Sequence, residues 1–70
     1  MDAKRVHFRF DDVAIGNPFI HVYSHTLIRF YEKKSLSSAY DLDPVTLERT
    51  GVTKVFGRCQ AVLPLATVNL

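Results

Sequence analysis

The sequence predicts a mainly β protein, a small antiparallel sheet or partial barrel with at most a short helix near residues 44–50. Residues 5–10 alternate between basic and apolar side chains, with the period of two that a half-buried strand requires. Residues 19–34 are rich in the β-branched and aromatic residues that favour strands. The Asp43-Pro44 pair is typical of a turn between two strands.

The size of the chain limits what it can bury. Its 70 residues are expected to fold as one small domain, 1–70, and a chain of this size buries only about 60% of its unfolded surface. Cys59 is the single cysteine, so no internal disulfide adds stability, and we expect a buried structural thiol. This cysteine content is compatible with a cytoplasmic location. No stretch approaches the ~20 apolar residues of a membrane span, and a net charge of +2 is too small to require a nucleic-acid partner.

The first predicted strand runs from Arg5 to Phe10. Its basic side chains share one face and its apolar side chains share the other: Arg5, His7 and Arg9 against Val6, Phe8 and Phe10. We interpret the basic face as a solvated sheet face, with phosphate binding as the alternative.

The central stretch, Phe19 to Lys34, supports two interpretations. As two strands bending near Ser24-His25-Thr26, it has apolar side chains on both faces, which is typical of a strand buried on both sides. As an amphipathic helix over 18–34, with Asn17 as the N-cap, it leaves Val22 and Ile28 on the polar side. The composition favours the strand pair, and the helix defines the alternative α+β fold.

The second half of the chain reads as further strands. Residues 35–39 form a polar loop. Residues 43–51 are either a short helix that ends at Gly51 or a hairpin turn opened by Asp43-Pro44. Residues 52–62 read as one strand with a bulge at Gly57, Pro64 interrupts the pattern, and residues 65–70 resume an apolar strand.

The apolar C-terminal region suggests a function. An apolar chain end must be held within the sheet or against a partner. A core this small cannot bury all of the apolar side chains, so some apolar surface stays exposed. The sequence therefore predicts a non-catalytic structural or protein-interaction subunit that completes its core in a homo-oligomer or a larger assembly. The predicted partner-binding residues are Val62, Leu63, Leu65, Val68 and Leu70.

One family resemblance supports antiparallel strands. From Pro18 to Val68 the sequence resembles one segment of the β-propeller of the carotenoid cleavage oxygenases, through Val22-Tyr23, Leu27 to Glu32, Tyr40 to Gly51 and Phe56-Gly57-Arg58. The resemblance implies consecutive strands of one blade, with a hairpin turn at Asp43-Pro44. That family binds non-haem iron through histidines, one of them in an Ala-His-Pro sequence shortly after this region. Here the corresponding residues are Leu65-Ala66-Thr67-Val68, without histidine, so neither the iron nor the oxygenase activity is carried over.

The sequence offers little for catalysis or metal binding. His21 and His25 would share one face of a helix, but on a straight strand they would be roughly 13 Å apart and could not chelate one ion. Cys59 has no recognisable catalytic neighbourhood, and the acidic pairs lie at turns. We therefore expect no enzyme activity, no catalytic or metal-ligating residues, and no cofactor.

Nucleic-acid binding is the alternative function. Residues 47–58 resemble the turn of a helix-turn-helix motif, with Gly51 at the bend and Thr53-Lys54 opening a recognition helix. The basic strand face at 5–9 offers a second surface. The residues that would contact nucleic acid are Arg5, His7, Arg9, Lys54 and Arg58.

Overall fold

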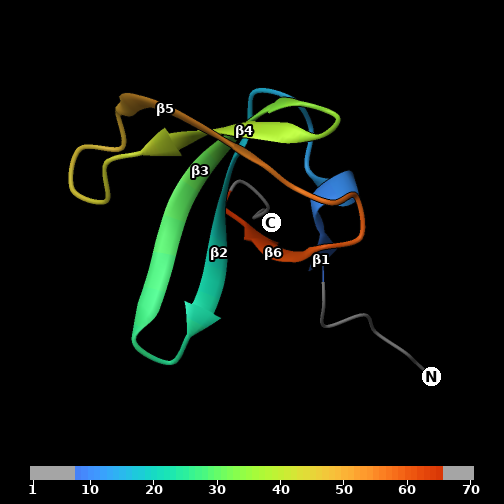
Figure 1. The fold of residues 1–70 in the computed structure, drawn as a ribbon, viewed down its shortest axis with the longest axis horizontal. Coiled ribbons are helices and arrows are strands. Elements are labelled where there is room, and N and C mark those ends of the chain that lie inside the picture. The colour runs from blue at the N-terminus through green and yellow to red at the C-terminus, as the bar shows by residue number, and fades with distance from the viewer. Residues whose placement is uncertain (1–7, 66–70) are drawn as a thin grey trace.

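The computed structural model of the protein describes residues 8–65, which form one 3-10 helix and an antiparallel sheet of six strands (Figure 1). The elements are β1 (Phe8–Arg9), η1 (Phe10–Asp12), β2 (Pro18–Ser24), β3 (Leu27–Ser35), β4 (Ser38–Leu42), β5 (Arg49–Val55) and β6 (Ala61–Pro64). The sheet order is β1-β6-β2-β3-β4-β5, so β2 to β5 form a meander and β6 returns to lie between β1 and β2. The predicted mainly β, antiparallel fold class is confirmed, and the sheet does not close on itself.

The central stretch forms the predicted strand pair. β2 and β3 are joined by a turn at His25-Thr26, and Ser24 Oγ accepts a hydrogen bond from the backbone N–H of Thr26 at 3.4 Å. Figure 1 shows this hairpin extending away from the rest of the sheet. The alternative helix over 18–34 is wrong, because tertiary pairing and the β-branched and aromatic composition outweigh the helical period.

Asp43 organises the hairpin between β4 and β5, which is the second of the two interpretations of residues 43–51. Its Oδ1 accepts hydrogen bonds from the backbone N–H groups of Val45, at 2.8 Å, and Thr46, at 3.1 Å. These two bonds lower the pKa of the Asp43 carboxyl below its ordinary value. The short helix over 44–50 does not form, because the chain turns back at once: the N–H of Asp43 donates to the carbonyl of Glu48 at 2.9 Å.

Two predicted strand boundaries are wrong. The first strand ends at Arg9, and Phe10 begins η1; residues 5–7 lie outside the described residues. The strand predicted over 52–62 is two strands separated by residues 56–60. Gly57 lies in that connection, and the bulge is at Gly51, whose φ of +96° accompanies the register shift opposite Tyr40 and Leu42. Cys59 is exposed rather than buried.

The hydrophobic core lies on one face of the sheet, called here the inner face. Because side chains alternate along a strand, this face carries Phe19 of β2, Tyr31 of β3 and Ala39 of β4, all buried. Phe56, from the connection between β5 and β6, completes an aromatic cluster with them and with Phe10. The predicted strand at 65–70 lies beyond the described residues except for Leu65.

A buried lysine ties β3 to η1. Lys33 is almost fully buried, and its Nζ donates a hydrogen bond to the carbonyl oxygen of Phe10 at 3.0 Å. The same Nζ lies 4.5 Å from the centroid of the Phe10 ring. The carbonyl and the ring face together compensate the lost hydration of the ammonium group.

Candidate functional site

The predicted partner-binding residues divide between the two faces of β6. Val62 points to the inner face and is 5% exposed, as a member of the core. Leu63 points to the opposite, outer face and is 47% exposed, and Leu65, which follows β6, is also exposed. Val68 and Leu70 lie outside the described residues. Of this set, the structure therefore leaves Leu63 and Leu65 accessible to a partner.

Leu63 belongs to a larger apolar surface on the outer face. Its cross-strand partner is Ile20, which pairs in turn with Phe30 of β3. Val22 and Ile28 form the next pair towards the hairpin tip and are 49% and 44% exposed. Directly opposed side chains on one face of a sheet are close enough to touch. The outer apolar surface is defined by these five residues: Ile20, Val22, Ile28, Phe30 and Leu63.

A neutral charge pair flanks this surface. Beyond Phe30 on β3, Glu32 Oε2 accepts a hydrogen bond from Arg49 Nη2 at 2.8 Å. The Arg49 Cζ lies over the Tyr40 ring, 3.9 Å from the ring centroid. The opposite charges of Glu32 and Arg49 cancel. The apolar surface is therefore bordered on this side by an ion pair with no net charge.

The residues predicted for nucleic-acid contact are dispersed. Arg9 Nη1 lies 3.9 Å from the Cys59 sulfur, and Arg58 Nε lies 3.9 Å from the Asp11 carboxylate. Lys54 lies on β5, on the inner face. Residues 49–55 form a strand, so the helices of a helix-turn-helix motif are not formed there. Arg5 and His7 lie outside the described residues.

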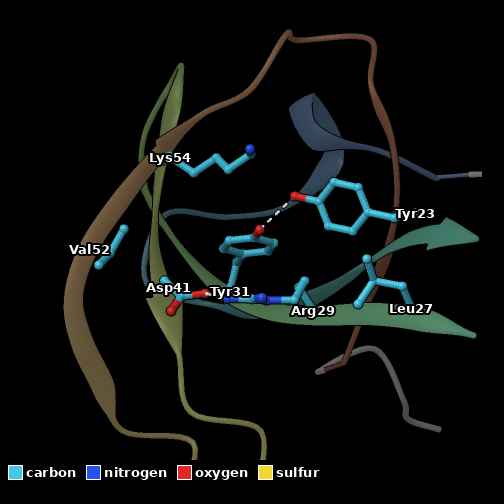
Figure 2. A pocket seen from close by; sticks show the side chains of 7 residues that line it. All are labelled: Tyr23, Leu27, Arg29, Tyr31, Asp41, Val52 and Lys54. Carbon is cyan, nitrogen blue, oxygen red and sulfur yellow. Dashed lines mark hydrogen bonds and ion pairs between the residues drawn. The ribbon is translucent and has the colours of Figure 1, made fainter.

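A pocket opens on the inner face, beyond the aromatic core (Figure 2). Its volume is about 310 Å³, and it lies between the β2–β3 hairpin and β5. Figure 2 shows the Tyr23 and Tyr31 hydroxyls directed at each other, and their oxygens are 2.7 Å apart. The lining residues are Tyr23, Leu27, Arg29, Tyr31, Asp41, Val52 and Lys54, and they define the inner pocket.

The polar groups of the inner pocket are ordered by Asp41. Its Oδ1 accepts a hydrogen bond from Arg29 Nη2 at 3.2 Å, and its Oδ2 accepts one from Thr50 Oγ1 at 2.8 Å. Burial, and secondly the hydrogen bond with Tyr23, raise the pKa of Tyr31 well above its ordinary value. Tyr31 is therefore a neutral phenol at physiological pH, able to donate a hydrogen bond.

His21 and His25 do not form a metal site. His21 is on β2 and His25 is in the turn that follows. His21 Nε2 accepts a hydrogen bond from the Gln60 side-chain N–H at 2.9 Å, and its buried Nδ1 has no hydrogen-bond partner in the described part of the chain. Burial, with the nearby Lys54 charge, lowers the pKa of His21. Residues 8–65 contain no cluster of three or more His, Cys, Asp or Glu side chains arranged to hold a metal ion, and no helix among them is long and apolar enough to cross a bilayer.

The sequence contained one signal of the outer apolar surface. Val22 and Ile28 are the two residues that do not fit an amphipathic helix, and on strands they make the second face apolar. That pattern predicts burial on both faces; the structure buries the inner face and, on the outer face, buries Leu42 but leaves Val22 and Ile28 exposed. The inner pocket had no such signal, since Arg29, Asp41 and Lys54 belong to three different strands.

Comparisons with known proteins give no further guide: the chain matches no known protein family, no curated protein and no solved structure.

Proposed function

We propose that the protein is a non-catalytic interaction subunit that associates with a second copy of itself through the outer apolar surface. The observation that carries this proposal is the row of cross-strand apolar pairs, Leu63 with Ile20 and Ile20 with Phe30, continued by Val22 with Ile28. An isolated exposed hydrophobic residue is normal on any protein, but a contiguous apolar row on a small domain marks an interaction surface.

The chemistry of this surface favours a second copy as the partner. A two-fold contact requires a surface that is complementary to itself. The five residues of the outer apolar surface carry no charge, so two copies face each other without repulsion. The nearest charges on β3 and β5, Glu32 and Arg49, are already paired within one chain. Association would remove water from Val22, Ile28 and Leu63, each of which is nearly half exposed.

The propeller resemblance points in the same direction. β2 to β5 form a four-stranded antiparallel meander, which is the layout of one propeller blade. A blade is stable only when its faces pack against neighbouring blades. The resemblance is compatible with an apolar outer face that needs a neighbour, and it adds no iron site or enzymatic activity to the proposal.

Nucleic-acid binding has less support than self-association. Arg58 lies near the Asp11 carboxylate, and Lys54 lies on the inner face, so these cations do not form one basic surface with Arg9. A filter-binding titration against salt tests this alternative, because phosphate contacts give a steep dependence on salt concentration.

Sedimentation velocity from about 10 µM to about 1 mM protein tests self-association, because this range covers weak specific contacts. A reductant is required, since the exposed Cys59 would otherwise form an artificial disulfide. We expect the wild-type sedimentation coefficient to rise with concentration. Ile28→Lys and Leu63→Lys should remain monomeric at all concentrations, because each places a charge in the contact.

The control variant is Val45→Lys, which adds the same charge at an exposed position in the turn between β4 and β5. It should associate like the wild type. Circular dichroism confirms that each variant folds. A folded wild-type protein that is monomeric throughout the range, or an Ile28→Lys variant that associates normally, would contradict the proposal.

A further inference from the structure

The inner pocket carries a second inference, independent of self-association because it lies on the opposite face of the sheet. Its volume of about 310 Å³ is at the lower end of the range for small-molecule sites. The side chains of Leu27 and Val52 and the ring of Tyr23 form the apolar part of the pocket lining. Its side chains come from four different strands, so the folded sheet holds them in place.

The formal charge of the pocket is positive. Arg29 and Lys54 are cations and Asp41 is the single anion among the lining residues. Both Asp41 oxygens already accept hydrogen bonds within the protein, from Arg29 and Thr50. A guanidinium has five N–H groups, and Arg29 uses one of them on Asp41. The remaining N–H groups of Arg29 are available to a ligand.

Lys54 has no carboxylate partner among residues 8–65. Its Nζ lies 5.8 Å from the centroid of the Tyr23 ring. Figure 2 shows the ammonium group directed into the pocket, on the side of the tyrosine pair opposite Leu27. An ammonium group held over an aromatic ring in this way keeps its three N–H donors free for an anion.

The tyrosine pair adds a further donor. The hydroxyls of Tyr23 and Tyr31 share one hydrogen bond of 2.7 Å, in which one hydroxyl donates and the other accepts. The accepting hydroxyl still has its own hydrogen to donate. The pocket therefore presents N–H and O–H donors, while the oxygens of its one carboxylate are engaged.

We propose that the inner pocket binds a small organic carboxylate with an apolar body, its carboxylate held by Lys54 and its body resting against the apolar part of the lining. A monoanion would neutralise the excess positive charge. An acidic ligand is preferred to a neutral one because the free groups of the pocket are donors. A cationic ligand would meet two cations.

Titration of the ¹⁵N-labelled protein with sodium benzoate, followed by NMR, tests this proposal. Benzoate should shift the amide signals of Arg29, Asp41 and Lys54 in a saturable way, and benzyl alcohol, which has the same ring without the charge, should produce much smaller shifts. Lys54→Gln should weaken benzoate binding about tenfold, because it removes one charge-assisted hydrogen bond.

Lys34→Gln is the matched control. Lys34 is also exposed, and its Nζ lies 5.5 Å from the ring of Tyr40, outside the pocket. This variant should bind benzoate within about twofold of the wild type, since the pocket is unchanged. Equal shifts with benzyl alcohol and benzoate, or equal losses in Lys54→Gln and Lys34→Gln, would overturn the proposal. The result is independent of self-association, because Ile28→Lys should bind benzoate normally.

Discussion

Replacing Phe56 tests how this open sheet is held together. Phe56 belongs to no strand, yet it is almost fully buried, and four rings surround it. The ring centroids of Phe10, Phe19, His21 and Tyr31 lie 5.1, 5.3, 5.5 and 5.0 Å from its own. The residue therefore fastens the connection between β5 and β6 onto the inner face of the sheet.

The magnitude follows from the burial. Removing a buried phenyl ring costs about 3–5 kcal/mol. A domain of this length has a total stability of about 4–10 kcal/mol. Phe56→Ala should therefore remove about a third or more of the free energy of unfolding. Phe56→Leu keeps most of the apolar volume and loses the ring contacts, so a loss of about 1–2 kcal/mol is expected.

Urea unfolding followed by circular dichroism measures both variants, since the chain has no tryptophan. With a slope of about 1 kcal/mol per molar urea, Phe56→Leu should lower the midpoint by about 1–2 M. Val55→Ala, at the exposed neighbouring position, is the control and should cost less than about 1 kcal/mol. A Phe56→Ala variant within about 1 kcal/mol of the wild type would refute this account of the core.

Two further predictions concern pH and backbone conformation. Because burial, and secondly Lys54, lower the pKa of His21 below its ordinary value of 6.5, the unfolded chain binds the proton more readily. The free energy of unfolding should therefore be highest above pH 6.5 and should fall as the pH drops below 6.5. Urea unfolding at a series of pH values measures this fall. It should be smaller for His21→Gln than for the wild type or for His25→Gln. Gly51→Ala should cost about 1–2 kcal/mol because its φ is +96°, whereas Gly57→Ala, with no positive φ, should stay within about 1 kcal/mol of the wild type. The pH account would be contradicted if the stability of His21→Gln and of His25→Gln fell equally with decreasing pH. The backbone account would be contradicted if Gly51→Ala and Gly57→Ala lost the same free energy of unfolding.

The meander from β2 to β5 could be predicted because its signals are local. Asp43 accepts hydrogen bonds from N–H groups two and three residues ahead, and all the bonds that close this turn join residues between Asp43 and Glu48. The β-branched and aromatic residues between Phe19 and Tyr31 outweigh the helical period of the same stretch. Both features arise mainly between residues that are close together in the sequence, although β2 also pairs with the distant β6.

The return of β6 could not be predicted because only distant contacts determine it. Phe8 pairs with Val62 and Ile20 pairs with Leu63, across separations of more than forty residues. The apolar pattern continues through Val55 and Phe56, so nothing local shows that β5 ends there. For the same reason the sequence predicts Val62 at a partner contact, whereas the structure buries it in the core.

The two candidate surfaces were predictable to different degrees. The apolar excess that led to an interaction subunit is present in the sequence, but its position is set by the alternation of side chains in β2 and β3. That alternation places Val22 and Ile28 outside and Tyr23 and Arg29 inside. The pocket brings together side chains of β2, β3, β4 and β5, and no local pattern specifies the register of β4 with β5.

The most direct test of self-association through the outer face is the concentration dependence of the ¹⁵N–¹H NMR spectrum, recorded with reductant present. On raising the concentration from about 10 µM to about 1 mM, we expect the amide signals of Val22, Ile28 and Leu63 to shift or broaden. Those of Val45 and Val52, which lie away from this surface, should stay constant. A spectrum that does not change, or changes confined to β5 and the inner pocket, would contradict the account.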